Sequence, residues 1–370
     1  MTRILIDGTP ISRHMDGLSQ YILQVVSRLP QRADRRYTVV VRPNECSDEI
    51  VRLWQEQGIE VCTARIAPIG WRREFQFRRW LRTRPAFDAA LIPSNQYPVF
   101  LPIPSVYVVH DLIYERYPSQ LGCCAYAKRM WLHHNVAKGL QKATAVIAVS
   151  EYTRDEILHF HPHTDERKIH VVYEGWEHLL QPVPQEPLNV PLKDYILYVG
   201  SSRGHKNLQG LLDAMTIAQE SFAPGQGLVI AGDQRRLTKR QRAQITALNG
   251  KVLTTGWLTS AQLTTCYRQA KAVIFPSLSE GFGIPALEAF YYQKPLLASC
   301  VASIPEVAGD AAVYFNPSDP AEIAQTLEHA ITMSEEEKKL WNEKGNKRLT
   351  AFSWQTTADE IEILLQSICH

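Results

Sequence analysis

Two glutamates eight residues apart, Glu280 and Glu288, flank a glycine-rich turn in the second half of the chain. The run AVIFPSLSEGFGIPALEAF, residues 272–290, is typical of a strand, a loop and a helix with Pro285 at its start. A helix start preceded by glycines favours an anionic ligand such as a diphosphate. Carboxylates would repel that anion, so we expect them to accept hydrogen bonds from neutral hydroxyls on either side of it, as sugars would donate. The alternative is that both are solvated surface charges.

Two cations, Arg203 and Lys206, lie in the stretch YVGSSRGHKN, residues 198–207. The pattern is typical of a strand, a turn and the start of a helix, with both cations in the turn. A cation at this place can bind a diphosphate and stabilise it as a leaving group. The alternative is that both are ordinary surface charges.

A histidine and an aspartate, His110 and Asp111, directly follow the apolar run SVYVV at 105–109. Polar residues at the carboxyl end of a predicted parallel strand are candidates for a site, because open α/β sheets bind their ligands at that edge. The alternative is a histidine that serves only in packing.

A basic and aromatic segment at 65–85 holds seven arginines and one glutamate, interleaved with four aromatic side chains. In a helix this pattern places aromatic rings beside a cationic face, which suits an anionic membrane surface or a lipid-diphosphate acceptor. The alternative is an aromatic stripe that faces the core, with solvated arginines. The residues predicted for the acceptor or membrane side are Trp71, Arg72, Arg73, Arg78, Arg79 and Asp111.

Metal and cofactor signatures are missing from the sequence. No two aspartates are separated by a single residue, and the first predicted turn keeps Gly8 and Gly17 without a G-x-G-x-x-G fingerprint. The histidine pairs at 133–134 and 161–163 have no cysteine or carboxylate at ligand spacing. We therefore expect neither a metal ion nor a cofactor.

The elements that must position these residues appear as short apolar runs between amphipathic stretches, in two series. Such runs are typical of parallel strands buried on both faces, so the predicted fold class is α/β in two halves. The predicted strands are 3–6, 37–41, 89–92, 105–109, 145–150, 195–200, 227–232, 251–256, 272–275 and 295–299. The predicted parts are an N-terminal domain at 1–177, a proline-rich linker at 178–192, a C-terminal domain at 193–352, and a helix at 353–370 that packs on the N-terminal domain.

Composition sets further limits. The chain has 370 residues and a net charge of +2, which leaves room for two domains and gives no global reason to bind nucleic acid. Its seven cysteines include no Cys-x-x-Cys and fit a reduced, cytoplasmic protein. Neither a signal-peptide core nor a run of 18 apolar residues is present, so we expect no membrane span.

Several stretches, in order along the chain, resemble one enzyme family. SEGFGIPALEA at 279–289, KPLLAS at 294–299 and SIPEVAGDAAVYFNPSDP at 303–320 look like the signature region of GT-B-fold retaining glycosyltransferases of the family-4 type, the glycosyl transferases group 1, with its Glu-x7-Glu motif. Other similar stretches are DGLSQYI at 16, VVHDLIYERYP at 108, AVIAVSEYTRDEI at 145, VVYEGW at 171, YVGSSRGHKNLQGLLDA at 198 and FSWQTTA at 352.

This resemblance implies two Rossmann-like α/β/α domains that face each other across a cleft, with a sugar nucleotide held mainly by the second. It implies that Glu280 contacts the donor sugar, Glu288 binds the ribose hydroxyls and Lys206 stabilises the leaving diphosphate, with His110 beside the donor sugar. The predicted catalytic residues are thus His110, Glu280 and Lys206. The predicted donor-binding residues are Gly17, Ser201, Arg203, Lys206, Leu258, Glu280, Gly281, Phe282, Gly283, Ile284 and Glu288.

The function that the resemblance implies is transfer of a hexose, with retention of configuration and without a metal ion, from a nucleotide diphosphate sugar to a glycan or lipid-linked glycan. UDP-glucose is the expected donor, in polysaccharide or glycolipid synthesis, and a GDP-mannose-dependent α-mannosyltransferase is the alternative. An alternative of another class is a non-catalytic partner protein of the same fold. The expected location is the cytoplasm, with peripheral contact to the inner face of the plasma membrane through the basic segment.

Overall fold

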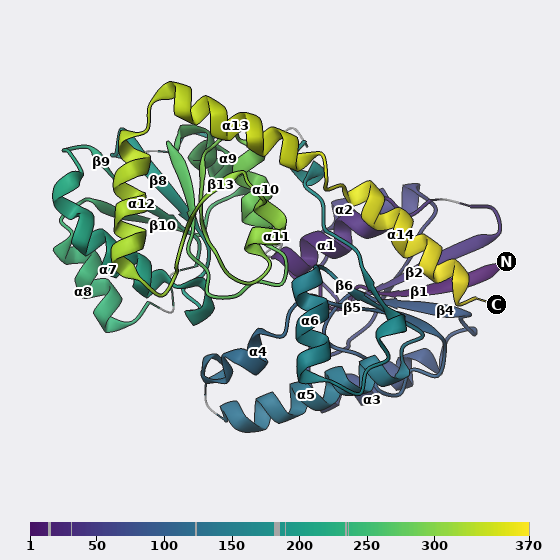
Figure 1. Ribbon diagram of the computed structural model, residues 1–370. Helices are drawn as coiled ribbons and strands as arrows, with labels where there is room; N and C mark the ends of the chain where they lie inside the picture. Colours follow the sequence, from purple (N-terminus) through teal and green to yellow (C-terminus); the bar gives the residue numbers. More distant parts are fainter. Residues whose placement is uncertain are drawn as a thin grey trace. The chain divides into compact units, whose positions relative to one another are not determined.

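The chain folds into two compact units, seen in the computed structural model of Figure 1. The structure describes residues 1–13, 16–30, 32–122, 124–180, 186–188, 190–233, 235 and 237–369. Unit 1 comprises Met1–Gly175 and Ser353–His370, and unit 2 comprises Trp176–Phe352. The chain passes from unit 1 to unit 2 at Gly175–Trp176, before the predicted linker at 178–192. Of the predicted linker and C-terminal segment, residues 181–185, 189 and 370 lie outside the described residues.

Unit 1 is built on a parallel sheet with the strand order β3-β2-β1-β4-β5-β6-β7 among its described residues. The central strands are apolar and buried along their length, as strands covered by helices on both faces must be. The strands are β1 (Thr2–Asp7), β2 (Arg35–Val41), β3 (Glu60–Thr63), β4 (Ala89–Ile92), β5 (Ser105–Val109), β6 (Ala145–Ala148) and β7 (Ile169–Val171). The α-helices are α1 (Gly17–Val26), α2 (Asp48–Glu56), α3 (Trp71–Leu81), α4 (Ile113–Arg116), α5 (Ala125–Lys142), α6 (Glu151–Phe160) and α14 (Trp354–Ser367).

The last helix, α14, belongs to unit 1 although it follows unit 2 in the sequence, and Figure 1 shows it in yellow beside α1 and β4. Trp354, Ile361 and Leu365 on its inner face are fully buried. Tyr37 Oη of β2 donates a hydrogen bond of 2.6 Å to Glu362 Oε2. Apolar burial and a buried polar contact therefore fix this helix to the first sheet.

Unit 2 repeats the arrangement with a parallel sheet of order β10-β9-β8-β11-β12-β13 among its described residues. The strands are β8 (Asp194–Val199), β9 (Gln226–Ala231), β10 (Val252–Gly256), β11 (Ala272–Phe275), β12 (Leu296–Ser299) and β13 (Ala312–Phe315). The α-helices are α7 (Leu208–Ala218), α8 (Lys239–Ala247), α9 (Ser260–Gln269), α10 (Ile284–Tyr291), α11 (Ile304–Ala308), α12 (Pro320–Thr332) and α13 (Glu335–Leu349).

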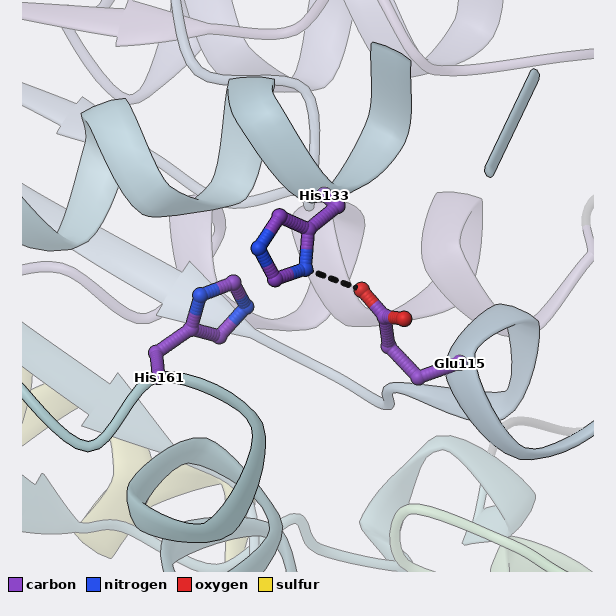
Figure 2. Close-up of side chains that lie close together, drawn as sticks. All are labelled: Glu115, His133 and His161. Carbon is purple, nitrogen blue, oxygen red and sulfur yellow. Dashed lines mark hydrogen bonds and ion pairs between the residues drawn. The ribbon is translucent and has the colours of Figure 1, made fainter. Parts of the chain in front are cut away.

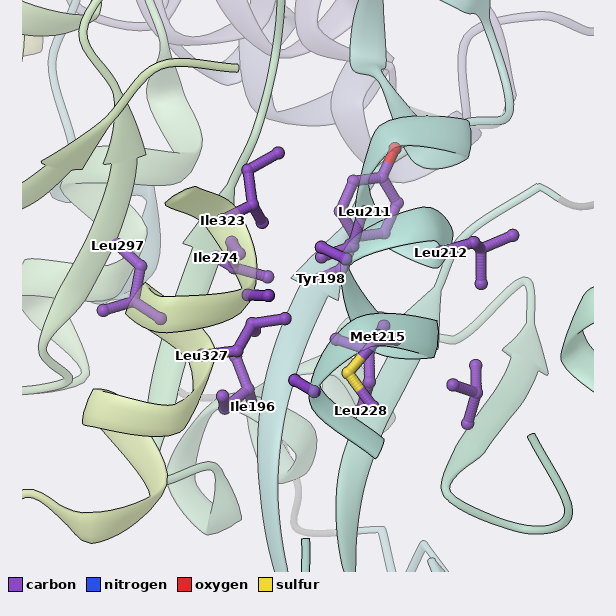
Figure 3. Close-up of a cluster of buried hydrophobic side chains, with 14 of the residues drawn as sticks. Ile196, Tyr198, Leu211, Leu212, Met215, Leu228, Ile274, Leu297, Ile323 and Leu327 are labelled. Carbon is purple, nitrogen blue, oxygen red and sulfur yellow. The ribbon is translucent and has the colours of Figure 1, made fainter. Parts of the chain in front are cut away.

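One core of unit 2 lies between the sheet and the helices α7 and α12 (Figure 3). Leu211 and Met215 of α7 and Leu327 of α12 are fully buried against Ile196 of β8 and Ile274 of β11. Full burial of such a side chain contributes about 1.5–3 kcal/mol to folding. The packing holds β8 and β11 in place, and their carboxyl ends carry the predicted cations and carboxylates.

The strand order places a topological switch point between β8 and β11, because the chain builds β9 and β10 outward on one side and β12 and β13 on the other. The two strands pair in parallel with Ala272 opposite Ile196 and Val273 opposite Leu197. In open α/β sheets ligands bind in the crevice at the carboxyl ends of such a pair. The corresponding switch point of unit 1 lies between β1 and β4.

The predicted α/β fold class is confirmed, and the strands that the sequence did not predict are β3, β7 and β13. All three lie at a sheet edge and are only partly buried. The strands β3 and β7 lack the continuous apolar run of a central strand, whereas β13 has one. No helix in the described part of the chain has the length and apolarity needed to cross a lipid bilayer.

Candidate functional site

Two loops of unit 2 meet at its switch point. The loop after β8 carries Lys206 within a short 3₁₀ helix, Gly204–Lys206. The loop after β11 carries Glu280, and the backbone N–H of Leu278 in that loop donates a hydrogen bond of 2.7 Å to the carbonyl oxygen of His205. This contact joins the two loops directly. Lys206 and Glu280, which are 74 positions apart in the sequence, therefore lie in one site.

Lys206 and Glu280 form an ion pair across these loops, with 2.7 Å between Nζ and Oε1. The side chains are 21% and 10% exposed, so the pair is largely removed from water. The Lys206 ammonium also lies 5.6 Å from the ring centroid of Phe275, at the end of β11. A partly dehydrated ammonium interacts more strongly with a nearby charge than an exposed one, which suits it to bind a polyanion.

The glycine-rich turn before α10 has a conformation that explains part of its sequence. Gly283 has a φ of +119°, and a Cβ there would lie 3.3 Å from Cε1 of Phe275. Ser303 Oγ donates hydrogen bonds to the carbonyl oxygens of Glu280, at 3.1 Å, and Phe282, at 2.7 Å. The turn is therefore held from outside, and the helix that follows has Pro285 in its first turn, where the missing N–H costs little.

Glu288 lies one turn into α10 and is held by an uncharged partner. Tyr267 Oη donates a hydrogen bond of 2.5 Å to Glu288 Oε2, and the Tyr267 ring stacks on Tyr292 with 4.8 Å between centroids. Burial raises the pKa of Glu288 above its ordinary value, while the Tyr267 hydrogen bond and the Lys206 charge oppose that rise. One ammonium thus acts on both carboxylates of the Glu-x7-Glu motif.

The other predicted donor residues of unit 2 fall in three places. Gly281, Phe282 and Ile284 belong to the turn and helix start just described. Ser201 lies in the loop after β8, where its carbonyl oxygen accepts a hydrogen bond of 3.1 Å from Tyr198 Oη, and the side chain of Arg203 in the same loop is exposed. Leu258 follows β10, which lies two strands away from β8 in the sheet, and its assignment to donor binding stays a prediction.

In unit 1, His110 lies at the carboxyl end of β5 with its ring fixed by several contacts. Nε2 lies 3.2 Å from the carbonyl oxygen of Pro93, and Nδ1 lies 3.4 Å from Glu174 Oε1. The Tyr21 ring packs edge-on against the imidazole, with 4.6 Å between centroids, and the His110 backbone N–H donates to Asn95 Oδ1 at 2.9 Å. Both ring nitrogens face oxygen atoms, so the side chain is a fixed polar group.

Gly17 and Asp111 lie near the same end of the unit 1 sheet. Gly17 opens α1, and an added Cβ would meet no atom within 4 Å, so packing within the chain does not require glycine there. Asp111 Oδ1 accepts a hydrogen bond of 3.2 Å from the backbone N–H of Ile113, at the start of α4. Their assignment to ligand binding stays a prediction.

The basic segment forms α3, and it differs from the prediction at one residue. Arg73 is fully buried, forms an ion pair with Asp7, and donates a hydrogen bond of 2.8 Å to Thr9 Oγ1. A buried guanidinium cannot contribute to a basic surface, so that prediction is wrong for Arg73: its charge serves the carboxyl end of β1 instead. The predicted residues that are exposed are Trp71, Arg72, Arg78 and Arg79.

The histidine pairs also differ from their interpretation. His133 Nδ1 lies 2.6 Å from Oε1 of Glu115, a carboxylate that the sequence analysis did not connect with it. The ring of His133 stacks on His161 with 4.5 Å between centroids. Sequence spacing did not show this carboxylate, because three separate helical segments bring Glu115, His133 and His161 together.

Sequence reasoning missed several residues that hold the site. Glu174 and Ser303 lie inside the stretches VVYEGW and SIPEVAG, which resemble the family, and this resemblance was a signal that could have found them. Tyr267 lies on α9 outside any motif. Its contact with Glu288 spans 21 residues and depends on packing between two helices, for which the sequence offers no signal.

The fold identifies a class of proteins. The structure resembles the crystal structure of Anabaena HepE in complex with UDP and glucose, with a TM-score of 0.73 at 17% identity, and the match covers 99% of this chain and 100% of that one. The chain therefore has the GT-B fold.

The family follows from sequence profiles. Residues 15–177 match Glycosyltransferase Family 4, and residues 184–348 match Glycosyl transferases group 1. Together the two matches span most of the chain, which belongs to this family of glycosyltransferases.

Curated relatives match at lower identity. O-antigen chain mannosyltransferase B of Escherichia coli is 26% identical over 238 residues, and serotype-specific mannosyltransferase WbdA of Escherichia coli is 28% identical over 286 residues. The matches cover 61% and 72% of this chain. They span 61% of the first relative's length and 34% of the second's.

Proposed function

We propose that the protein is a retaining mannosyltransferase that moves mannose from GDP-mannose to a glycan or a lipid-linked glycan. The observation that carries the proposal is the Lys206–Glu280 ion pair at the switch point of unit 2, next to the start of α10. A cation, a helix N-terminus and two carboxylates can together recognise a diphosphate with hydroxyl groups on both sides of it.

The choice of donor follows the relatives. From the sequence alone, UDP-glucose is the expected donor and GDP-mannose is the alternative. The names of both reported relatives refer to mannosyltransferases, which favours the alternative. HepE, whose structure holds UDP and glucose, shares the fold at 17% identity, and that likeness has no weight in choosing a donor.

Each side chain of unit 2 has a defined part in the proposed reaction. Lys206 neutralises charge that develops on the leaving diphosphate, and it replaces its bond to Glu280 by one to the phosphate. Glu280 then accepts hydrogen bonds from hydroxyls of the mannose, and Glu288 accepts them from the ribose. The backbone of Gly281–Ile284 approaches the diphosphate, because a helix start favours an anion.

The proposed transfer takes place on one face of the sugar. The bond between C1 and the diphosphate oxygen breaks as the bond between C1 and the acceptor oxygen forms on the same face, and the acceptor proton passes to an oxygen of the leaving diphosphate. His110 contributes a fixed polar contact to the reacting sugar. The positive charge for the leaving group comes from Lys206, so the proposed step uses no metal ion at the diphosphate.

Donor binding and turnover are the direct test. Calorimetric titration of the full chain with GDP-mannose, UDP-glucose and ADP-glucose should show tight binding of GDP-mannose only, and product analysis with labelled GDP-mannose should show mannosyl transfer. Tight binding of UDP-glucose alone would replace the proposed donor. No binding of any donor would favour the non-catalytic partner protein of the same fold.

Matched variants test the assignment of residues. Lys206→Ala is expected to lower kcat by about 10²–10³-fold, as loss of a charge that stabilises the transition state does. Glu280→Gln should also lower kcat, since the amide is a weaker acceptor. Lys239→Ala and Glu336→Gln make the same charge changes at exposed positions of unit 2 and should leave kcat unchanged. If the site variants and the control variants lowered kcat equally, the site assignment would be wrong.

We also propose that the exposed face of α3 contacts an anionic membrane. Trp71 and Phe75 are 59% and 62% exposed, and Arg72, Arg78 and Arg79 are exposed on the same helix. Aromatic rings beside arginines suit the interface of a bilayer with anionic lipids.

Vesicle sedimentation tests this surface. The full chain should sediment with anionic vesicles and less with neutral ones, and Arg78→Glu with Arg79→Glu should reduce the bound fraction. Lys239→Glu with Arg240→Glu on α8 makes the same charge change elsewhere and should have little effect. Equal recovery with both vesicle types would remove the electrostatic proposal.

A further inference from the structure

Three side chains of unit 1 converge on one point from three helical segments (Figure 2). Glu115 lies on α4, His133 lies on α5, and His161 directly follows α6. One potential ligand atom from each lies within 4.8 Å of the other two. Among the described residues no other group of three His, Cys, Asp or Glu side chains meets this condition.

The carboxylate of Glu115 is buried and oriented. Its side chain is 1% exposed. Arg129 Nε donates a hydrogen bond of 2.9 Å to Oε2, and His133 Nδ1 lies 2.6 Å from Oε1. Arg129 therefore holds one oxygen, which leaves Oε1 to face the two imidazoles.

His161 supplies an observation of a different kind. The residue is 7% exposed, and its Nε2 is buried without a hydrogen-bond partner. A buried polar atom without a partner costs about 1–3 kcal/mol. Figure 2 shows the His161 ring beside that of His133, whose Nδ1 contacts the Glu115 carboxylate. The structure thus keeps an unpaired nitrogen where two other ligand atoms already meet.

We propose that Glu115, His133 and His161 bind a divalent transition-metal ion, Zn²⁺ in the first place. Two imidazole nitrogens and one carboxylate oxygen are a donor set that zinc takes in proteins, with a water molecule in the fourth position. Zinc bonds of about 2.0–2.2 Å put ligand atoms roughly 3.4 Å apart, so rotation of the side chains brings the present set to that spacing. The ion replaces the proton between His133 and Glu115 and uses the unpaired Nε2 of His161.

Arg129 then lies outside the ligand set and orients the carboxylate. A hydrogen bond to the second oxygen of a metal-bound carboxylate is a usual support for such a site. Arg129 is 39% exposed in its side chain, so solvent screens its repulsion of the ion.

The site would join α4 to α5 and to the end of α6. Helix α4 begins at Ile113, directly after the segment that carries His110 and Asp111. A metal ion there would fix this short helix, which has only one turn, and so restrain the residues that precede it. This site lies wholly within unit 1 and does not depend on the proposed mannosyl transfer.

Metal content and affinity test the proposal on the full chain. After exposure to Zn²⁺ and dialysis, the wild type should retain about one zinc per chain, and Co²⁺ should give the visible absorption of a tetrahedral site. His161→Gln and Glu115→Gln should each lower zinc affinity at least about tenfold. Zinc should also raise the melting temperature of the wild type and not that of Glu115→Gln.

Neighbouring histidines are the controls. His134 adjoins His133, His163 lies two residues after His161, and both are exposed. His134→Ala and His163→Ala should change the zinc affinity less than about twofold, since neither side chain belongs to the ligand set. The proposal is overturned if the wild type retains no zinc, or if these control variants bind it as weakly as the cluster variants do. Stable, folded Glu115→Gln with undiminished zinc binding would overturn it as well.

Discussion

At the scale of single residues, the Glu288 carboxylate depends on a neighbour without charge. Tyr267 Oη donates to it at 2.5 Å and is itself buried under Tyr292. A hydrogen bond to a charged group contributes about 1.5–3 kcal/mol, and this one fixes the direction of the carboxylate as well. Tyr267 is thus a positioning residue for the ribose contact proposed for Glu288.

Tyr267→Phe is expected to raise the KM for the donor about tenfold, which corresponds to about 1.4 kcal/mol, and to leave kcat nearly unchanged. The reason is that ribose binding should contribute equally to the ground state and the transition state. Steady-state kinetics with GDP-mannose measure the separate effects on KM and kcat. Tyr292→Phe removes a hydroxyl that lies 2.9 Å from Thr264 Oγ1 and should leave KM unchanged. A fall in kcat at constant KM would contradict the ribose assignment.

A second residue-scale effect concerns His205, which is 5% exposed beside Lys206. Burial lowers the pKa of His205 from its ordinary value to about 4, with Lys206 and Arg203 adding to the fall and Glu280 opposing it. In the unfolded chain His205 is therefore protonated below about pH 6.5, whereas in the folded chain it becomes protonated only near pH 4. This histidine's contribution to stability is fully present above pH 6.5 and is lost as the pH falls through that window.

His205→Gln should remove this part of the pH dependence. Between about pH 7.5 and pH 5 the wild type should lose about 2 kcal/mol more free energy of unfolding than the variant. Urea unfolding at both pH values measures the difference. His163→Gln changes an exposed histidine and should keep the wild-type slope. Parallel pH profiles of the wild type and His205→Gln would show that burial of His205 does not set this dependence.

The sequence predicted the site residues that follow strands within recognisable motifs, and it could not predict residues whose partners lie far away in the sequence. Lys206 and Glu280 each follow a recognisable strand and belong to contiguous motifs, so their meeting could be inferred from a parallel sheet. Arg73 could not be placed, because its partner Asp7 is 66 residues away and helical periodicity alone does not show that an arginine is buried. The same limit applies to Glu115 and His133, which no motif connects.

At the scale of elements, the turn before α10 depends on its backbone conformation. Gly283 has a φ of +119°, which a residue with a Cβ adopts only with strain, and the ring of Phe275 closes the space beside it. Gly17 opens α1 after the first strand of unit 1, and a Cβ there would meet nothing within 4 Å. The backbone conformation and packing thus require glycine at position 283 and not at position 17.

Gly283→Ala should destabilise the turn by about 1–3 kcal/mol and weaken donor binding, since the helix start would move. Gly17→Ala should leave stability within about 0.5 kcal/mol of the wild type. Calorimetric melting and donor titration measure both quantities. If Gly17→Ala also weakened binding at unchanged stability, a ligand must approach its backbone; if Gly283→Ala bound the donor normally, the turn would not serve binding.

The elements that the sequence predicted and those it missed differ in burial. Strand β5 was predicted at its observed bounds because all five residues are buried and four of them are apolar or aromatic. Strand β7 alternates between exposed and half-buried residues over three positions, so it has no apolar run to recognise. The sequence predicted every strand inside the sheets and the edge strand β10, and it missed the edge strands β3, β7 and β13.

At the scale of the whole molecule, the chain leaves unit 1 at Gly175, forms unit 2 and returns at Ser353. Unit 1 is therefore completed only by residues that follow unit 2 in the sequence. Helix α14 supplies it with Trp354, which is fully buried and packs edge-on against Tyr21 with 5.6 Å between ring centroids. Tyr21 in turn packs on His110. The C-terminal helix therefore supports the ring of this predicted catalytic residue through Tyr21.

Trp354→Ala should lower the stability of unit 1 by about 3–5 kcal/mol, because removal of a buried indole leaves a cavity beneath α1. Limited proteolysis followed by mass spectrometry should then show new cleavage within residues 1–175 and 353–369, and protection of 190–349 close to that of the wild type. Ile363→Ala is the matched control on the same helix, since that side chain is 64% exposed and its loss should cost less than about 0.5 kcal/mol. New cleavage confined to residues 176–352 would mean that α14 stabilises unit 2 instead, and the assignment of this helix to unit 1 would have to be given up.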